Sequence, residues 1–441
     1  MSDKIVRNEI DIQSVPGWWE REKQRRQLRI LILLCFLLGL IAFFYYVSAL
    51  GRTGIVNGVN FDTSNHIAFV RQDANGATSL YTVRADGTDL VRLTAASDNS
   101  DKSAPAWTVD GTRLLYASNR QDSKKTQIYI LGAGDPVQLT YGPGRKDSPQ
   151  AVPGGQYAAF ITQGAIKTVQ LNGEAVTQLL PEPRAGNEDA TEAGKQGDVE
   201  PTGPYLSAVF SSDGASVAGT QELDPENGTD TSGMSVGDQV ARAYPSGASR
   251  AAFLNSGHYV SSAWDPNGKR LLVDYAELPI TDPITHKSRE PIYASGLSLW
   301  SFENPNRPIE KQLIVCGGFG VTPRNIAWSP DGTRVACEAW YLKSEGVREL
   351  RGIMVLRIPA QRVTMTARQS QSVPIPLPIT DKGVPSNPRW SPDGSRLLFQ
   401  MTRPDHKNDL WVINKDFTNA INLTKGVGDN TQGVWAPARA K

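Results

Sequence analysis

Apolar residues alternate with polar ones in short stretches along most of the chain after residue 55. Examples are Arg113–Ala117 (RLLYA), Gln127–Leu131 (QIYIL), Arg396–Gln400 (RLLFQ) and Asp409–Ile413 (DLWVI). A period of two residues is the signature of a β-strand with one buried face. Gly, Asp, Asn and Pro lie between these stretches, as expected for tight turns. The pattern therefore predicts an all-β structure of many short strands.

The strands belong to a repeated unit that an aromatic residue opens. The clearest copies are AWSPDGTR at Trp328 and RWSPDGSR at Trp390, and weaker ones stand at Phe61, Trp107, Ala151, Phe210, Trp264 and Trp435. In each copy we expect the aromatic residue to end one strand. Ser-Pro-Asp-Gly then makes a tight turn, because Pro fixes φ and Gly accepts a positive φ. An apolar strand, an aromatic-bearing strand and a closing Leu-Thr follow, as at Leu93-Thr94.

Successive copies start 44–64 residues apart, and the shortest spacings match one four-stranded propeller blade. The sequence predicts a seven-bladed β-propeller, with six or eight blades as alternatives. The copy at Trp435 heads only one strand, so we expect it to close the ring by pairing with the first blade, around Ile67–Val70 or Asn57–Phe61. Closure of this kind removes exposed sheet edges.

The repeat resembles that of the TolB-type (WD40-like) β-propeller family. WSPDG, an apolar strand, an aromatic-bearing strand and a closing Leu-Thr carry the likeness, and Tyr81–Thr94 (YTVRADGTDLVRLT) is especially similar. The resemblance implies the propeller fold and, for the source, a bacterial envelope. It does not imply TolB's own role, because we expect the propeller to begin close after an apolar segment, without TolB's N-terminal α/β domain.

That apolar segment, Ile30–Leu50, has 21 residues without a charge, which is long enough to cross a bilayer as one helix. Five basic residues precede it closely, and only Arg52 follows it closely. The positive-inside rule places the N-terminus in the cytoplasm. We expect a cytoplasmic segment at 1–29, a transmembrane helix at 30–50 and an extracytoplasmic propeller at 55–441. A cleaved signal peptide ending near Val47-Ser48-Ala49 is the alternative.

Four stretches exceed the length that a blade needs, and we expect them to lie as loops on the faces or rim of the propeller. They are Pro181–Pro204, Asp224–Gly237, Glu277–Ser298 and Pro359–Pro388. Connecting loops on a rigid scaffold are common binding surfaces. The insertions therefore point to a protein partner.

Composition narrows the chemistry. With 46 basic and 45 acidic residues, the formal net charge is +1, which disfavours nucleic-acid binding. Three Cys and four His leave little material for a disulfide scaffold or a metal centre. The repeat Trp residues are expected to pack between blades, and Asp110, Asp331 and Asp393 to serve the turns. Whether Cys316 and Cys337 form a disulfide is left open. We name no catalytic, cofactor-binding or metal-ligating residue and expect no cofactor.

The sequence favours a single-pass protein of the inner (cytoplasmic) membrane with a periplasmic or extracellular propeller. The expected function is a scaffold that binds a protein or an envelope component. An enzyme that acts on a polysaccharide or peptide at an axial site, and a structural subunit of a larger membrane complex, are the alternatives. Fold and topology follow from the repeats, whereas the partner and the oligomeric state do not.

Overall fold

The structure is a computed structural model. It describes residues 27, 29, 54–56, 59–61, 65–72, 76–95, 97–180, 204–222, 238–243, 252–254, 261–276, 280–281, 288–289, 295–302, 309–315, 321–344, 347–358 and 383–438. The chain divides into two compact units, Met1–Thr53 and Gly54–Lys441. In the first unit only Gln27 and Arg29 are described, and both are helical. No described helix is long and apolar enough to span a bilayer. The expected span, residues 30–50, lies outside the described residues.

The second unit consists of antiparallel sheets in which consecutive strands pair. The sheets that build the ring are β31-β3-β4-β5 (Asp429–Trp435, His66–Gln72, Thr78–Arg84, Val91–Arg92), β6-β7-β8-β9 (Lys102–Trp107, Leu114–Asp122, Lys125–Leu131, Val137–Gln138), β10-β11-β12-β13 (Asp147–Ala151, Tyr157–Thr162, Ala165–Gln170, Thr177–Leu180), β14-β15-β16-β17 (Tyr205–Phe210, Val217–Glu222, Asp238–Ala243, Ala252–Leu254), β18-β19-β22-β23 (Ser262–Trp264, Arg270–Ala276, Ser295–Ser301, Ile309–Val315), β24-β25-β26 (Val321–Trp328, Arg334–Ser344, Val347–Arg357) and β27-β28-β29-β30 (Val384–Trp390, Arg396–Thr402, Asn408–Asn414, Ile421–Asn422). Two small hairpins, β1-β2 (Gly54–Val56, Val59–Phe61) and β20-β21 (Ile280–Thr281, Ser288–Arg289), stand apart from them.

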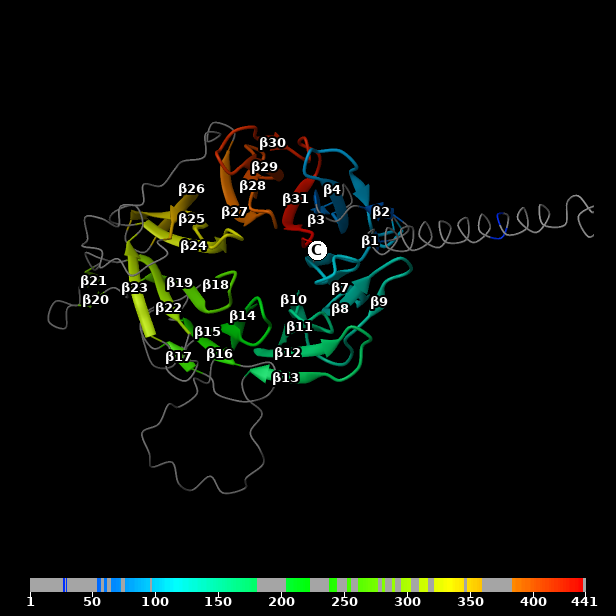
Figure 1. The fold of residues 1–441 in the computed structure, drawn as a ribbon, viewed down its shortest axis with the longest axis horizontal. Coiled ribbons are helices and arrows are strands. Elements are labelled where there is room, and N and C mark those ends of the chain that lie inside the picture. The colour runs from blue at the N-terminus through cyan, green and yellow to red at the C-terminus, as the bar shows by residue number, and fades with distance from the viewer. Residues whose placement is uncertain are drawn as a thin grey trace, which may run out of the picture. The chain divides into compact units, whose positions relative to one another are not determined.

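These sheets are arranged radially around an axis, so the second unit is a β-propeller (Figure 1). Each sheet is named here by its first, innermost strand. Six sheets are complete four-stranded blades, including the β10 sheet, which contains the weak repeat copy at Ala151. The β24 sheet has three described strands and lies between the β18 and β27 blades. The expected count of seven complete blades is therefore not confirmed and stays a prediction.

The last strand closes the ring. β31 pairs with β3, with Trp435 opposite Ile67 and Val434 opposite Ala68, so the first blade takes its innermost strand from the C-terminal end of the chain. The predicted pairing with Ile67–Val70 is confirmed. The expectation that the copy at Phe61 opens a blade is wrong: Phe61 lies in β2, which pairs only with β1.

The Ser-x-Asp-Gly turns join the first and second strands, as predicted. In the turn after β27, the Ser391 hydroxyl donates to Asp393 at 2.6 Å and accepts the backbone N–H of Arg396 at 2.9 Å. Ser211 and Ser329 do the same in their sheets. The glycine of each turn has a positive φ. An aspartate that satisfies turn donors needs no other role, so the structural interpretation of these residues is confirmed.

The closing Leu-Thr pairs lie just beyond the fourth strand. The Leu139 amide still bonds to the Ile128 carbonyl, and the next ladder position is filled by a side chain: Thr140 Oγ1 accepts the Ile128 amide at 2.9 Å. Thr94 and Thr424 make the equivalent contact with Leu80 and Leu410. A hydroxyl thus replaces a strand carbonyl where the narrow outer strand ends, which explains why Thr recurs there.

Tryptophan side chains lie between neighbouring blades, as expected. Trp107, at the end of β6, packs in one buried cluster with Leu80 and Leu93 of the β31 blade. Trp390 packs likewise against Ile353 and Val355 of the β24 sheet. An indole buries a large apolar area, so each contact stabilises the junction between two sheets.

The two ends of the ring differ. We call the end with the Ser-x-Asp-Gly turns the turn face, and the opposite end, where second strands lead to third strands and outer strands to the next inner strand, the loop face. Three of the insertions connect strands at the loop face, where the strand before each insertion ends and the strand after it begins. They contain residues 181–203, 223–237 and 277–294. Residues 359–382 also lead into β27 there. The expected insertions Glu277–Ser298 and Pro359–Pro388 are shorter than predicted, because β22 begins at Ser295 and β27 at Val384.

Candidate functional site: the axial channel

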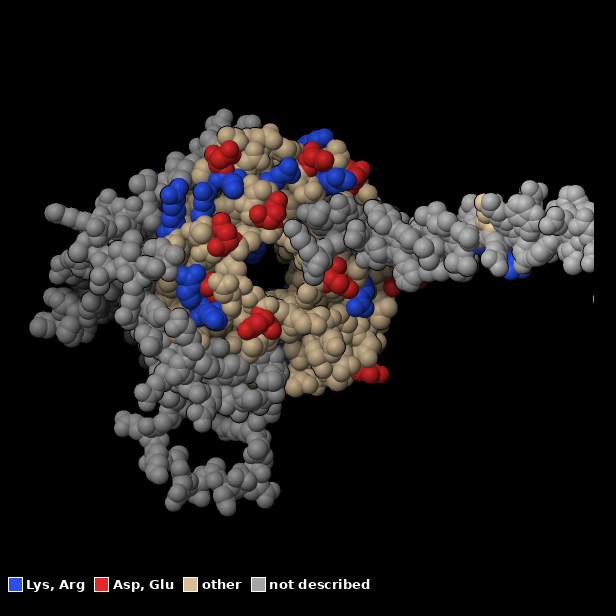
Figure 2. All heavy atoms as spheres, viewed as in Figure 1, with Lys and Arg blue, Asp and Glu red and all other residues tan. Residues whose placement is uncertain are grey.

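The inner strands surround a channel of about 860 Å³ along the axis of the propeller. Its walls come from β6, β10, β14, β18, β24, β27 and β31, and Figure 2 shows its opening at the centre of one face. A cavity of this size suits a small ligand or a few residues of an extended chain. The channel is therefore the candidate functional site.

A repeated bulge shapes the wall of the channel. Five inner strands carry one residue with φ between 50° and 56°, three positions before the residue that ends the strand: Ala104, Ser148, Asn325, Asn387 and Gln432. The pairing register with the second strand shifts at each of these places. A residue other than Gly in this left-handed region costs about 1–2 kcal/mol. Because the bulge recurs in five inner strands, it is a regular structural feature of the ring and not a local defect.

Side chains from the preceding sheet hold the bulged backbone. The Asn387 amide donates to Glu338 Oε1 at 2.8 Å, and the Gln432 amide donates to Gln400 Oε1 at 2.8 Å. Gln432 in turn accepts the amide of Ala104 through its own side-chain oxygen. These bonds join the β24, β27, β31 and β6 sheets in sequence around the axis. They compensate the backbone strain and make the channel wall rigid.

The bulged positions form a polar layer. At this level the wall presents hydroxyl and amide side chains, with Ala104 as the exception: Ser148, Ser207, Ser261, Asn325, Asn387 and Gln432. Asn325 Nδ2 donates to Asn387 Oδ1 at 3.2 Å. The hydroxyls of Ser261 and of its neighbour Ser262 are buried and have no hydrogen-bond partner among the described residues. Buried hydroxyls without a partner are uncommon, and these two line the channel.

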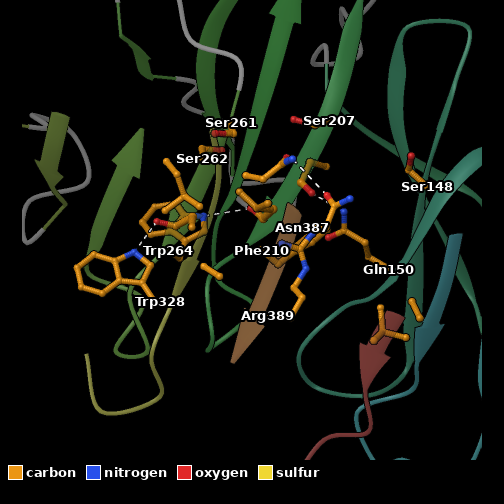
Figure 3. Close-up of a pocket in the computed structure, with 18 of the residues that line it drawn as sticks. Ser148, Gln150, Ser207, Phe210, Ser261, Ser262, Trp264, Trp328, Asn387 and Arg389 are labelled. Carbon is orange, nitrogen blue, oxygen red and sulfur yellow. Dashed lines mark hydrogen bonds between the residues drawn. The ribbon is translucent and has the colours of Figure 1, made fainter. Parts of the chain in front are cut away.

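Two positions further along each strand, towards the turn face, the wall becomes an apolar layer of small residues. They are Ala106, Val209, Ala263, Ala327 and Val434. Only Gln150 and Arg389 bring long polar side chains to this level, and Figure 3 shows them with residues of the polar layer around the channel. Gln150 Nε2 is bonded to the carbonyl of Ala208. Arg389 is therefore the one long side chain at this level that the neighbouring strand does not hold, among the residues described.

Arg389 has a fixed backbone and an accessible guanidinium. Its carbonyl accepts the indole N–H of Trp435 at 3.1 Å. Its Nη1 donates to the carbonyl of Pro388 at 3.0 Å, and it forms no ion pair with a described residue. Burial within the ring lowers the pKa of Arg389 and the nearby Glu338 raises it. Although protein surrounds it, the side chain remains open to solvent through the channel. An arginine stays protonated in such surroundings, so the channel holds a fixed positive charge.

Glu338 does not neutralise that charge by direct contact. The carboxylate is only 3% exposed and has both oxygens occupied, Oε1 by the amide of Asn387 and Oε2 by the indole of Trp340 at 2.8 Å. Its role is to support the bulge next to Arg389. The guanidinium therefore keeps donors free for a ligand.

Arg389 is not among the residues that the sequence patterns single out for a site, although the repeats contain a signal for it. The residue before the tryptophan is Ala106, Ala263 and Ala327 in three repeats, and arginine in the copy at Trp390. A departure from a small apolar residue at a position that faces the axis marks a site. The bulges are harder to recognise in the sequence, because Ala104 and Gln432 are not residue types that favour a positive φ.

The other residues considered from the sequence stay apart. His66 is buried in β3, and His406 lies in an exposed turn; His258 and His286 lie outside the described residues. No group of three or more His, Cys, Asp or Glu that could hold a metal occurs among the described residues. Cys337 is buried, and Cys316 lies outside the described residues.

One of the insertions contains a sequence motif that occurs around the nucleophile of some serine hydrolases. Residues 233–237 read Gly-Met-Ser-Val-Gly, a Gly-x-Ser-x-Gly sequence, in the insertion between β15 and β16. These residues lie outside the described residues. The motif acquires meaning only on a strand-to-helix turn, so the pentapeptide carries no assignment.

No protein-family model and no curated protein matches the sequence. Among solved structures, TolB from Acinetobacter baumannii is similar at 15% identity over 86% of this chain and 69% of that chain, with a TM-score of 0.45. A puromycin-hydrolyzing peptidase from Mycobacterium tuberculosis is similar at 16% identity over 84% of this chain, with a TM-score of 0.50; this chain covers 55% of its length. Oligogalacturonate lyase in complex with manganese is similar at 14% identity over 82% of this chain and 85% of that chain, with a TM-score of 0.47. At such identities the likeness shows the propeller fold and leaves function open.

Proposed function

We propose that this protein is a membrane-anchored, extracytoplasmic β-propeller that binds a protein or an envelope component through its loop face. The observation that carries the proposal is the one-sided distribution of the insertions. Strands that flank three of them end at the loop face, and the fourth leads into β27 at the same face. The polar layer of the channel is nearer to that face than the apolar layer, so the partner would meet loops around a polar opening.

The location rests on the sequence of the first unit. Ile30–Leu50 has the length and the uncharged character of a bilayer span, and the basic residues before it favour a cytoplasmic N-terminus. The propeller would then face the periplasm or the exterior from the inner membrane. A reporter fused after Lys441 tests the orientation, and the mass of the mature N-terminus tests retention of the anchor. Activity of a cytoplasm-only reporter, or a mature start near Leu50, would contradict the respective part.

The proposal includes seven blades. The β24 sheet lacks a described fourth strand, and the sequence supplies a candidate in residues 359–382 that ends with Ile379-Thr380. Thr380 precedes Trp390 by 10 residues, and Thr140 and Thr424 precede the ends of their following inner strands by 11. Replacing Thr380 by Val should destabilise the propeller as much as Thr140→Val does. A neutral Thr380→Val would argue for six blades.

Partner binding is tested with the full chain in membranes. We suggest crosslinking and purification of the wild type, of a variant in which residues 181–203 are replaced by a Gly-Ser segment of equal length, and of Val137→Ser. Val137 is the first residue of β9, is 55% exposed and lies where that strand starts at the turn face, so this variant is the matched control. The proposal expects a partner that the wild type and Val137→Ser retain and the loop variant loses. A partner that the loop variant retains and Val137→Ser loses would place binding on the turn face and contradict the proposal.

A further inference from the structure

We propose that the axial channel binds the carboxyl terminus of a peptide that ends in a small apolar residue, with Arg389 holding the terminal carboxylate. This site goes beyond the loop-face proposal, because it assigns a ligand chemistry to the channel and can fail while loop-dependent partner binding persists. Three features of the described residues carry it: one unpaired cation, the small apolar wall beside it and the polar layer above it.

The charge at the site fits a monoanion. Arg389 contributes a single guanidinium whose Nε and Nη2 donate to no described residue. A planar fork of donors matches a carboxylate, which can accept two parallel hydrogen bonds. A doubly charged group such as a phosphate ester would leave one charge uncompensated and close to the buried carboxylate of Glu338. The channel therefore suits a carboxylate better than a dianion.

The wall next to Arg389 fits a small apolar side chain. The channel wall at the level of residue Arg389 presents the methyl groups of small apolar residues, namely Ala106, Val209, Ala263, Ala327 and Val434. A sugar acid placed there would bury ring hydroxyls against apolar atoms, and each hydroxyl left without a partner weakens binding. A C-terminal Ala or Val has apolar atoms beside its carboxylate instead. This difference selects the peptide over an acidic sugar.

The polar layer fits the amides that precede a peptide's last residue. The side-chain oxygens of Asn387 and Gln432 accept from Asn325 and Ala104, and their NH₂ groups are the donors that can bond to peptide carbonyls. Ser261 and Ser262 also belong to the channel lining, but their hydroxyls are buried from solvent and are not assigned to the ligand. Figure 3 shows these serines and Asn387 at the same channel as Arg389.

The direction of entry follows from the order of the layers. A peptide that enters from the loop face passes the polar layer first and brings its carboxylate to Arg389 last. Entry from the turn face would carry the anion past the aspartates of the turns, such as Asp331 and Asp393, at the ends of the inner strands. Electrostatic repulsion disfavours that approach. The loop face is therefore the entrance.

The test uses the full chain in detergent and two probes, acetyl-Ala-Ala-Ala with a free carboxylate and the same peptide as its C-terminal amide. Calorimetry measures both affinities. We expect the acid to bind at least about tenfold more tightly than the amide, because only the acid forms the charge-assisted pair. Arg389→Gln should bind both probes equally weakly, and Arg389→Lys should restore part of the preference.

Two further variants keep the test decisive if Arg389→Gln unfolds. Gln150→Glu adds a negative charge at the level of Arg389 and should weaken the acid at least about tenfold. Arg145→Gln removes an exposed arginine, paired with Asp147 outside the channel, and should bind like the wild type. Equal binding of acid and amide, no binding at millimolar peptide, or an unchanged preference in folded Arg389→Gln would overturn the proposal. Tight binding of galacturonic acid without peptide binding would assign the channel to an acidic sugar instead.

Discussion

The indole of Trp435, on the last strand of the chain, donates a hydrogen bond of 3.1 Å to the carbonyl oxygen of Arg389 in the neighbouring blade. The strand that closes the ring thus fixes the backbone of the channel's arginine. The same contact recurs without an arginine: Trp264 donates to Val209 at 3.1 Å, and Trp328 donates to Ala263 at 3.0 Å. Comparison of these contacts separates their effect on stability from their effect on the site.

Trp435→Phe should lower the free energy of unfolding by about 1 kcal/mol, the usual net contribution of one hydrogen bond. Trp328→Phe is the matched control, because it loses the equivalent bond to Ala263 and should cost a similar amount. Peptide binding should weaken only in Trp435→Phe, because only that bond positions Arg389. Denaturation and calorimetry measure the two effects. Equal loss of binding in both variants would contradict a positioning role for Trp435.

Deleting residues 429–441 should unfold or severely destabilise the propeller. The deletion removes β31, and with it the buried Asn430 and Ala436 and the inner partner of β3, which keeps only β4. The expected loss of several kcal/mol is comparable with the total stability of a typical domain. The control deletes only 439–441, which lie outside the described residues. Normal melting of the longer deletion would show that ring closure contributes little.

Much of the fold is predictable because each blade repeats the same local chemistry. Ser-x-Asp-Gly encodes a turn by hydrogen bonds within six residues, and the alternating strands need only nearby partners. Closure of the ring by the single strand at Trp435 is also predictable, whereas the choice between Ile67–Val70 and Asn57–Phe61 as its partner comes from the structure. The number of blades is not settled in the same way, because the β24 sheet lacks a described outer strand.

The channel could be predicted only in part. The bulge at Asn387 depends on Glu338, 49 residues away, and that at Gln432 depends on Gln400 of the preceding blade. Contacts of this kind between blades do not produce a repeating pattern in the sequence. Arg389 does stand out when the repeats are aligned, because alanine occupies the same position in three of them. Its free donors, however, follow from the packing of its neighbours.

Lys102 begins the inner strand β6, and Lys146 directly precedes the next inner strand, β10. Their ammonium groups have different partners. The Lys102 side chain is 0% exposed, and its ammonium contacts Asp98 at 3.1 Å as well as the carbonyls of Asp98 and Ser100. Lys146 donates only to carbonyls, those of Gly142, Pro143 and Gly144. Burial lowers the pKa of both lysines, and Asp98 opposes the shift at Lys102.

Lys102→Met should therefore cost about 3 kcal/mol, because it leaves a largely buried carboxylate without its main cation. Lys146→Met should cost less, about 1–2 kcal/mol, for carbonyls that lose a donor. In a double-mutant cycle, Asp98→Asn should be coupled to Lys102→Met and not to Lys146→Met. Chemical denaturation at neutral pH measures each term. If the two lysine variants lose equal free energy of unfolding and show no coupling to Asp98→Asn, the Lys102–Asp98 ion pair adds nothing to stability.

The turn aspartates predict how stability changes with acid. The hydroxyl of Ser329 and the amide of Thr333 donate to Asp331, and together they lower the pKa of that carboxyl. In Asp393 burial opposes the charge, yet the hydrogen bonds from Ser391 and Ser395 outweigh it and lower the pKa. A carboxyl with a lowered pKa in the folded state contributes stability that is present above its unfolded value, about 3.9. That stability is lost as the pH falls through the lower, folded pKa.

The melting temperature should accordingly stay nearly constant from pH 7 to about 5 and decline below about 4. Asp331→Asn should melt lower than the wild type at pH 7 and lose less on acidification, because the amide cannot titrate. Asp135→Asn is the control: Asp135 has no hydrogen-bond or ion-pair partner among the described residues, and its variant should follow the wild-type profile. Differential scanning fluorimetry across this range provides the measurement. A wild-type decline that Asp331→Asn reproduces in full, with the same melting temperature at pH 7, would mean that this turn carboxylate does not stabilise the ring.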